Sequence, residues 1–283
     1  MTIFYGLQPA LLAGAMTLWY INPGWDAGYI ATLLGLQILL GCMEYWRPAR
    51  PHWRQRWPER LRNIGIWFVG STLAVTIIGW YHTHLTEPLA VLRERLQLDI
   101  WPHEWPVLVQ VLMVFLLAEL IWYWIHRAEH RWGTMWRVTG HGAHHSFKRL
   151  GAINFGANHP FEIAFLVLPA ATIELLFGVG AAAAGAAMLA LVQVSVAHAN
   201  LRMNSQVIGW LFTTNDYHLL HHSIVLEESN TNYGCAAIVW DRLFGTFAHT
   251  KVAEAGTGAI EPGTWRKFLM PFKEPEGVDI APT

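Results

Sequence analysis

The chain has 283 residues, of which 53% are hydrophobic and only 14% are charged, and its formal net charge is -1. Soluble domains carry about 25% charged residues, so the deficit indicates that much of the surface faces lipid. The near-neutral charge excludes a protein that attracts nucleic acid by its overall field. The 16 Trp are typical of membrane interfaces, and the two cysteines, Cys42 and Cys235, have no metal-binding spacing.

Six apolar stretches approach the length of about 20 residues that a membrane-spanning helix needs. They are 3–21, 27–46, 63–81, 107–125, 161–178 and 180–197. A turn sequence, Asn22-Pro-Gly-Trp-Asp26, separates the first two. Only residues 178–180 separate the last two, which we predict as a tight hairpin; whether it crosses the membrane fully is left open.

Basic residues predict the orientation of these helices. The segment Arg47–Arg62 contains six arginines and one acidic residue, Glu59. Because cytoplasmic loops are enriched in Lys and Arg, we place this segment in the cytoplasm. The N-terminus and residues 82–106 are then outside, and residues 126–160 and those after about 198 are cytoplasmic. The arginine run is either a phospholipid-facing loop that sets topology or a docking patch for an acidic electron donor.

The predicted fold class is all-α: an integral membrane helical bundle with a cytoplasmic helical cap that carries three histidine-rich boxes. Residues 1–106 are expected to form the N-terminal transmembrane helices and the basic loop. Residues 107–250 are expected to form a catalytic domain that contains the boxes and further transmembrane helices. Residues 251–283 form a tail rich in Gly, Pro and Glu, which is predicted to be loosely ordered.

Eight histidines form the three boxes: His126–His130 (HRAEH), His141–His145 (HGAHH) and His218–His222 (HLLHH). Positions i, i+3 and i+4 share one face of a helix, so each HxxHH is predicted to direct three imidazoles at one point. A random chain with this histidine content would hold roughly 0.04 copies of HxxHH, whereas this one holds two. We therefore interpret the boxes as metal ligands rather than as unrelated core or interfacial histidines.

The number of imidazoles indicates how many metal ions they bind. Imidazole suits Zn, Cu, Fe and Ni, but structural zinc takes four ligands and catalytic zinc three. Eight histidines therefore favour two ions with open positions, and coordination chemistry alone leaves iron, zinc and copper open. All three boxes are predicted at one membrane face, where a site could take a lipid chain from the bilayer and electrons from a soluble donor.

The order and spacing of the boxes resemble those of the fatty acid hydroxylase/sterol desaturase superfamily. The matching stretches are Glu119–His130, His141–His145, Asn158–Pro160, His198–Asn200, His218–His222, Asn232–Gly234 and Trp240–Thr246, and the resemblance covers about residues 115–247. It implies a di-iron centre, O2 as co-substrate, and hydroxylation or desaturation of a C–H bond in a fatty acyl chain, sterol or related lipid.

The resemblance also implies a metal ligand between the second and third boxes, and His198 occupies that position. Some family members have another histidine four residues earlier, where this chain has Val194. The implied ligands are His126, His130, His141, His144, His145, His198, His218, His221 and His222. The histidines outside this set are interpreted as non-ligands: His52, His82, His84, His103 and His249.

Glu119 is a candidate functional residue because it lies within an apolar span, where a charge costs about 2.5–3.5 kcal/mol. It precedes His126 by seven residues, roughly 10 Å along a helix, which is too far for easy ligation. We predict that it contacts another histidine or a substrate hydroxyl. Pairing within the bundle is the alternative, and it is the favoured interpretation for Glu174.

Three further polar residues are candidates for supporting the ligands. His159 is predicted as a ligand, as a partner of a ligand, or as a cap before the helix that starts at Pro160. Asn200 and Asp241 are each predicted to accept the outer N–H of an imidazole, and pairing with Arg242 is the alternative for Asp241.

The predicted function is that of an O2-dependent, membrane-bound di-iron oxygenase that hydroxylates or desaturates a lipid. The alternative is a membrane metal transporter or sensor, but a transporter places its polar ligands within the spans, and these boxes lie at predicted span ends. A zinc hydrolase is disfavoured because the HExxH signature is absent.

No dinucleotide-binding GxGxxG, cysteine cluster or haem motif is present in the sequence. Electrons are therefore expected from a separate reductase or a ferredoxin- or cytochrome-type donor, soluble or membrane-bound. The other expected partners are the lipid substrate and membrane lipids, not nucleic acid. The expected location is the bacterial inner membrane with a cytoplasmic catalytic face, or the endoplasmic reticulum in a eukaryote.

Overall fold

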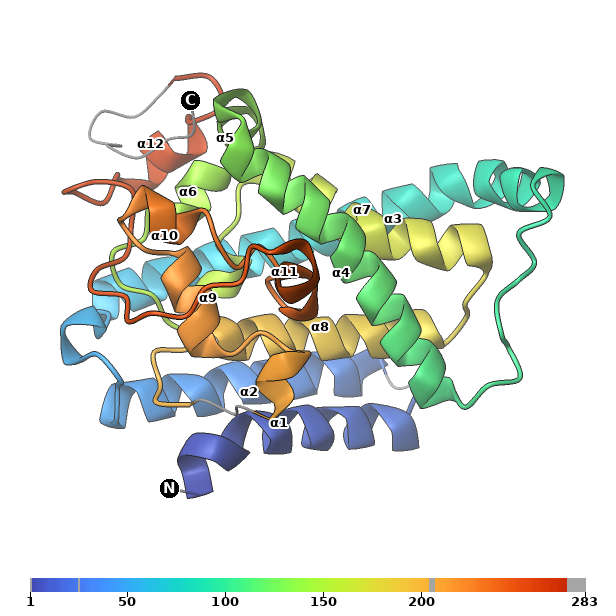
Figure 1. Cartoon of the computed structure of the whole chain (residues 1–283), viewed down its shortest axis with the longest axis horizontal. Helices are drawn as coiled ribbons and strands as arrows, with labels where there is room; N and C mark the ends of the chain where they lie inside the picture. The colour runs from blue at the N-terminus through green and yellow to red at the C-terminus, as the bar shows by residue number, and fades with distance from the viewer. Residues whose placement is uncertain (1, 25, 204–206, 274–283) are drawn as a thin grey trace.

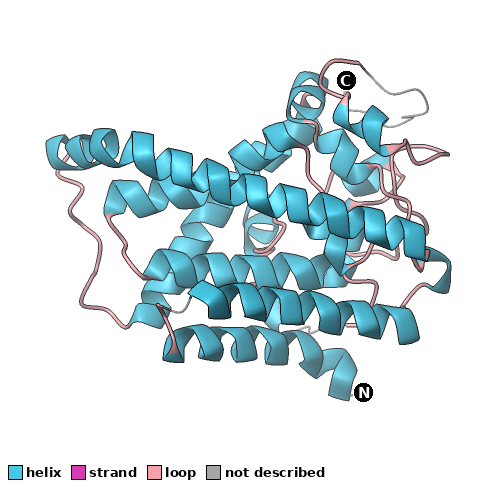
Figure 2. Ribbon diagram, turned by 180° about the vertical axis from the view of Figure 1, so that it is seen from behind, coloured by secondary structure: helices cyan, strands magenta, loops and turns pink. Residues whose placement is uncertain are grey.

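The computed structural model describes residues 2–24, 26–203 and 207–273. These residues form helices and turns and no strand (Figure 2). An isolated β-bridge joins Ser223 to Ala255. The predicted all-α fold class is confirmed.

The six predicted apolar stretches all lie in helices. These are α1 (Thr2–Ile21), α2 (Asp26–Trp46), α3 (Trp57–Arg95), α4 (Val107–Arg131), α7 (Pro160–Phe177) and α8 (Ala182–His198). Four described segments are long and apolar enough to cross a membrane: Ala27–Trp46, Trp57–Arg95, Val107–Arg131 and Pro160–Phe177. The chain is thus a helical membrane protein, and α8, with 17 residues, is shorter than a usual span. In Figure 1, α4 crosses the other long helices obliquely.

Helix α3 is much longer than the sequence predicted. It does not end near residue 81 but continues to Arg95, with Pro88 inside it, and spans 39 residues. The apolar window ends where the side chains become polar, but the helical backbone does not need apolar side chains to continue. Contacts with α7 continue into the extension, since Nε2 of His82 lies 3.3 Å from the carboxylate of Glu174. The predicted exterior loop 82–106 is therefore reduced to residues 96–106.

Short helices gather at one end of the long ones and form a cap (Figure 1). They are α5 (Gly133–Thr139), α6 (His141–His145), α9 (Asn215–His221), α10 (Leu226–Ser229), α11 (Val239–Phe244) and α12 (Thr264–Phe268), with the 3-10 turns η1 (Pro51–Trp53), η2 (Ala152–Gly156) and η3 (Ile208–Trp210). The second and third histidine boxes form α6 and most of α9, while the first box is the end of α4 itself. The cytoplasmic location of the cap stays a prediction.

Polar side chains fix α8 between its neighbours. The Gln8 side chain on α1 donates to Gln193 at 3.0 Å, and Gln37 on α2 donates to the Ser195 hydroxyl at 2.9 Å. Because an unpaired polar group is costly in apolar surroundings, these pairs select one register of α1 and α2 against α8. That register sets the position of the last residue of α8, His198.

The described part of the C-terminal tail is packed, so the prediction of a loosely ordered tail is wrong for residues 251–273. Lys267 is only 6% exposed. The Glu261 carboxylate accepts hydrogen bonds from Arg62 at 3.0 Å and from Lys267 at 2.9 Å. Composition alone missed these contacts because the partner, Arg62, lies far away in the sequence. Residues 274–283 lie outside the described part of the chain.

Candidate metal centre

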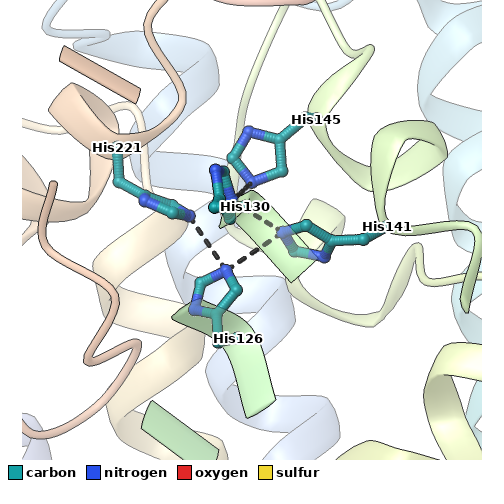
Figure 3. A group of neighbouring side chains, drawn as sticks. All are labelled: His126, His130, His141, His145 and His221. Carbon is teal, nitrogen blue, oxygen red and sulfur yellow. Dashed lines mark hydrogen bonds between the residues drawn. The ribbon is translucent and has the colours of Figure 1, made fainter. Parts of the chain in front are cut away.

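All nine predicted ligands come together inside the cap, in two groups. The five-histidine cluster contains His126, His130, His141, His145 and His221, and the four-histidine cluster contains His144, His198, His218 and His222. Within each cluster, one ring nitrogen from every histidine lies within 4.8 Å of all the others. Figure 3 shows the five-histidine cluster, with rings from α4, α6 and α9 pointing at a common centre. All nine side chains are buried.

Each HxxHH box serves both clusters, contrary to the prediction that its three imidazoles meet at one point. In α6, His141 and His145 lie one turn apart and face the five-histidine cluster, while His144 faces the other. In α9, the pair one turn apart, His218 and His222, belongs to the four-histidine cluster. Positions i+3 and i+4 lie on opposite sides of position i around the helix, so a helix wedged between two sites divides its histidines in this way.

The two clusters adjoin. The rings of His145 and His222 stack with their centroids 4.3 Å apart, although they belong to different clusters. The imidazoles therefore line two adjoining candidate metal sites rather than two remote ones.

Two glycines allow α6 to reach this position. Gly140 has a φ of 79°, which turns the chain between α5 and α6 in a conformation that glycine adopts without strain. Gly142 lies against the indole of Trp136 on α5, where an added Cβ would be only 2.4 Å from Nε1. The centroid of the Trp136 indole in turn lies 5.2 Å from the centroid of the His130 imidazole.

The partners of the outer ring nitrogens fix the tautomers. Nδ1 of His126 lies 2.6 Å from the carbonyl oxygen of Tyr233, and Nδ1 of His221 lies 2.7 Å from that of Thr231. A carbonyl oxygen only accepts, so each Nδ1 carries the hydrogen and each Nε2 has a free lone pair. These two Nε2 atoms face each other at 3.0 Å. Two lone pairs at this distance repel unless a cation lies between or beside them.

The four-histidine cluster shows the same arrangement. Nδ1 of His198 donates to the carbonyl of Val194 at 2.8 Å, which leaves its Nε2 as an acceptor. That Nε2 lies 3.0 Å from Nε2 of His218 and 3.2 Å from Nε2 of His144. The donor set of both clusters therefore fits a metal ion, since every fixed lone pair points inward.

Burial keeps these imidazoles in the metal-binding form. It lowers the pKa of His145, His221 and His222 well below the usual value, and neighbouring imidazoles lower it further. Neutral imidazole is the form that binds metals. Cys235 is nearby, with Sγ 3.4 Å from Nδ1 of His126. Burial raises the pKa of this thiol well above its usual value, and its sulfur lies beside the outer nitrogen of His126 rather than the inward-facing Nε2.

Comparison with known proteins agrees with this geometry. Residues 111–246 match the model of the family described as fatty acid hydroxylase. An ornithine lipid hydroxylase of Rhizobium tropici is 28% identical over 94% of this chain and 83% of that protein. A very-long-chain aldehyde decarbonylase of Oryza sativa is 30% identical over 62% of this chain and 69% of that protein. An alkylglycerol monooxygenase of Xenopus tropicalis is 27% identical, but the match covers only 30% of its length. No solved structure matches the chain.

The chain belongs to the fatty acid hydroxylase family. The predicted membership of the wider superfamily is confirmed, and this family member is a membrane lipid oxygenase. The alternative of a metal transporter or sensor is not favoured by these relatives.

In this fatty acid hydroxylase family member, Glu119 is buried against the backbone. Its carboxylate accepts from the amide of Ala236 at 3.1 Å, so the prediction that it contacts another histidine is wrong. The contact holds the segment that follows Tyr233, whose carbonyl binds His126. Glu119 therefore stabilises the ligand from a distance, by fixing a loop across the bundle.

Asp241 also acts through the backbone rather than by accepting an imidazole N–H, as was predicted. Its two oxygens accept from the amides of Tyr233 and Gly234 at 2.7 Å each and from the Thr246 hydroxyl at 2.7 Å. It does not pair with Arg242, which donates instead to a carbonyl oxygen, that of Gly209. Asp241 thus shapes the turn that presents the Tyr233 carbonyl to the metal centre.

Asn200 and His159 have structural contacts of their own. The Asn200 side chain pairs with the backbone of Arg50 in both directions, at 2.9 and 3.0 Å, so the prediction that it accepts from an imidazole is wrong. His159 is the cap among its three predicted roles. It accepts from the amide of Phe161 at the start of α7, and its other ring nitrogen contacts the carbonyl of Phe268 at 3.0 Å.

Three buried glutamates near the centre were missed by the sequence analysis. Glu44 on α2 accepts from the amides of Ala152 and Asn200 and so anchors the chain just after His198, the last residue of α8. Glu129 and Glu162 lie beside His141. The signal that could have found Glu162 is its acidic side chain in the first turn of an apolar helix; Glu119 was singled out by the related signal of a charge within an apolar span.

Proposed function

We propose that the two clusters hold two iron ions, with the nine histidines as ligands, and that the chain is a di-iron lipid hydroxylase. The observation that supports this most is the set of inward-facing lone pairs, above all Nε2 of His126 and His221 at 3.0 Å. Five and four imidazoles leave open positions on ions that accept six ligands. Imidazole also suits copper and zinc, and the oxygenase relatives favour iron.

When bound, the two ions would supply O2 activation and the oxidation of an unactivated C–H bond. The overall reaction is R–H + O2 + 2 e⁻ + 2 H⁺ → R–OH + H2O, so two electrons must enter for each turnover. We propose a separate reductase or a ferredoxin- or cytochrome-type protein as the donor, and a cytoplasmic catalytic face in the bacterial inner membrane. The arginine-rich segment that starts at Arg47 supports this orientation.

The protein's own contribution is to orient the ligands and exclude water. Carbonyl oxygens of Tyr233 and Thr231 set the tautomers of His126 and His221. The indole of Trp122 stacks on His126 with a centroid distance of 5.5 Å and covers it on the side of the bundle. Rigid burial of this kind would keep the ions in one position relative to a bound lipid, and the position of its reacting C–H bond decides between hydroxylation and a second hydrogen abstraction.

We propose ornithine lipid or a related membrane lipid as the substrate. The relative whose name specifies that lipid aligns over 94% of this chain, whereas the alkylglycerol monooxygenase aligns over 49%. The names of both relatives favour hydroxylation over desaturation.

Metal analysis and lipid analysis together test the proposal. Purified protein should contain about two iron ions per chain. Cells that express it should gain a lipid species heavier by about 16 mass units. The reaction should stop when the reductase is omitted. His144→Ala and His221→Ala should abolish this product, whereas His84→Ala, at an exposed histidine outside both clusters, should retain it. Zinc-only or copper-only protein with full activity would refute the proposal.

A further inference from the structure

The outer nitrogens of the two clusters meet different partners. In the five-histidine cluster, Nδ1 of His141 lies 2.7 Å from the carboxylate of Glu162, and the outer nitrogens of His126 and His221 donate to carbonyl oxygens. In the four-histidine cluster, Nδ1 of His218 and Nδ1 of His222 are buried and make no hydrogen bond with described residues. One cluster is thus tied to an anionic group, and the other is not.

A second carboxylate reinforces the first. Glu129 lies on α4 directly before His130, and its Oε2 is 3.6 Å from Nδ1 of His141. Glu129 and Glu162 are 0% and 1% exposed, and their oxygens and the His141 nitrogen all lie within 4.8 Å of one another. Together they form a carboxylate pair around one imidazole.

This carboxylate pair lacks the usual positive partners. Besides His141, the polar partners of the pair among the described residues are neutral: the Thr139 side chain for Glu129 and the backbone of His159 for Glu162. Among the ion pairs of the described chain, their only partner is His141, without any Lys or Arg. Buried carboxylates need compensating charge. The positive charge nearest to the pair would be an ion bound by His141 on its inner nitrogen.

We propose that Glu129 and Glu162, acting through His141, make the five-histidine cluster the tighter of the two metal sites, so that the ion in the four-histidine cluster is the first to leave. The inference rests on the proposed function and deepens it. Three features act in the same direction: five ligands against four, a carboxylate that orients the His141 ring, and negative charge beside the ion. Both glutamates are positioning residues, since neither needs to touch the reacting atoms.

The size of the effect can be estimated from comparable sites. Removing a carboxylate that holds a ligating imidazole typically lowers metal affinity 10- to 100-fold. We expect a loss in this range for Glu162→Gln, which keeps an oxygen for the His141 N–H but removes the charge and replaces the other oxygen with an NH2 group. Glu162→Asp, which restores the charge, should recover part of the affinity.

The test measures metal content per chain after equilibration with increasing chelator, using iron-loaded protein in lipid nanodiscs without O2. Wild type should release its ions in two separate steps. In a His222→Ala background, which disables the four-histidine cluster, Glu162→Gln should weaken the remaining ion about 10- to 100-fold. In a His141→Ala background, which removes the imidazole through which Glu162 acts, the same change should have little effect.

Glu174→Gln is the matched control. Glu174 lies on the same helix, α7, and pairs with an imidazole, His82, at 3.3 Å, but that histidine belongs to neither cluster. This variant should release its ions as wild type does. The absorption spectrum of cobalt-loaded protein gives a second readout, since it should change in Glu162→Gln and not in Glu174→Gln.

Several results would overturn the inference. Release of both wild-type ions in one step would do so, as would identical release curves for Glu162→Gln and Glu174→Gln. If Glu162→Gln does not fold, Glu129→Gln in the same assay decides. Wild-type protein that binds no metal would instead remove the proposed function, and the inference with it.

Discussion

Asp241 offers the sharpest test of how the loop beside the metal centre is held. Its Oδ1 accepts from the amide of Tyr233 and the hydroxyl of Thr246, and its Oδ2 accepts from the amide of Gly234. A hydrogen bond to a charged group contributes about 1.5–3 kcal/mol. Asp241→Asn keeps one oxygen and places an N–H against that of Gly234, so it should cost about 2–3 kcal/mol.

Asp241→Ala removes both acceptor oxygens and all three hydrogen bonds, and should cost about 5 kcal/mol or more. Unfolding in mixed micelles with increasing SDS measures both losses. Metal content should fall in the same order, because Tyr233 presents its carbonyl to His126. Glu227→Gln, at an exposed position on the nearby α10, is the control. If both Asp241 variants unfold at the same SDS fraction as this control, the loop is not held as we argue.

Three further changes have expected outcomes. Gly142→Ala should abolish metal binding and lower thermal stability, because its Cβ would lie 2.4 Å from the indole nitrogen of Trp136. The control, Gly263→Ala, has open space around the added Cβ and should not change the thermal melt. Burial lowers the pKa of Lys267 from 10.5 to about 8. Between these two pH values the unfolded chain therefore binds more protons than the folded chain, so the free energy of unfolding should rise with pH. Lys267→Met should flatten this rise when unfolding is measured from pH 7 to 10. An unchanged slope would contradict us. His159→Ala should cost about 1 kcal/mol and speed hydrogen exchange in α12, and unchanged exchange there would show that the contact is unimportant.

The convergence of the box histidines could be predicted from sequence because helix geometry relates spacing to direction. His141 and His145 share a face whatever surrounds them, so their joint role follows from the motif. The division of each box between two clusters could not be predicted, because it depends on how α6 lies between α4, α8 and α9. Nothing in the local sequence of His144 distinguishes its cluster from that of His145.

Contacts between distant segments were the least predictable. Glu162 reaches His141 only because α7 begins beside α6, and Glu261 has an ion-pair partner only because α3 brings Arg62 beside it. For Glu119 and Asp241, the sequence indicated buried acidic residues near the site but not their partners. Backbone amides carry no sequence signature, so a carboxylate that binds them cannot be distinguished from one that binds an imidazole.

The length of α3 has a consequence for the bilayer around the protein. Its 39 residues extend about 58 Å at 1.5 Å per residue, roughly twice the hydrocarbon thickness of about 30 Å. Even at a tilt of about 40°, the upper end of the usual range, the rod rises about 45 Å, which equals the thickness of a membrane with both headgroup layers. In a thinner bilayer α3 must lean further, and Gly70, which packs against Gly156 of η2, would transmit that lean to the segment that follows the second histidine box.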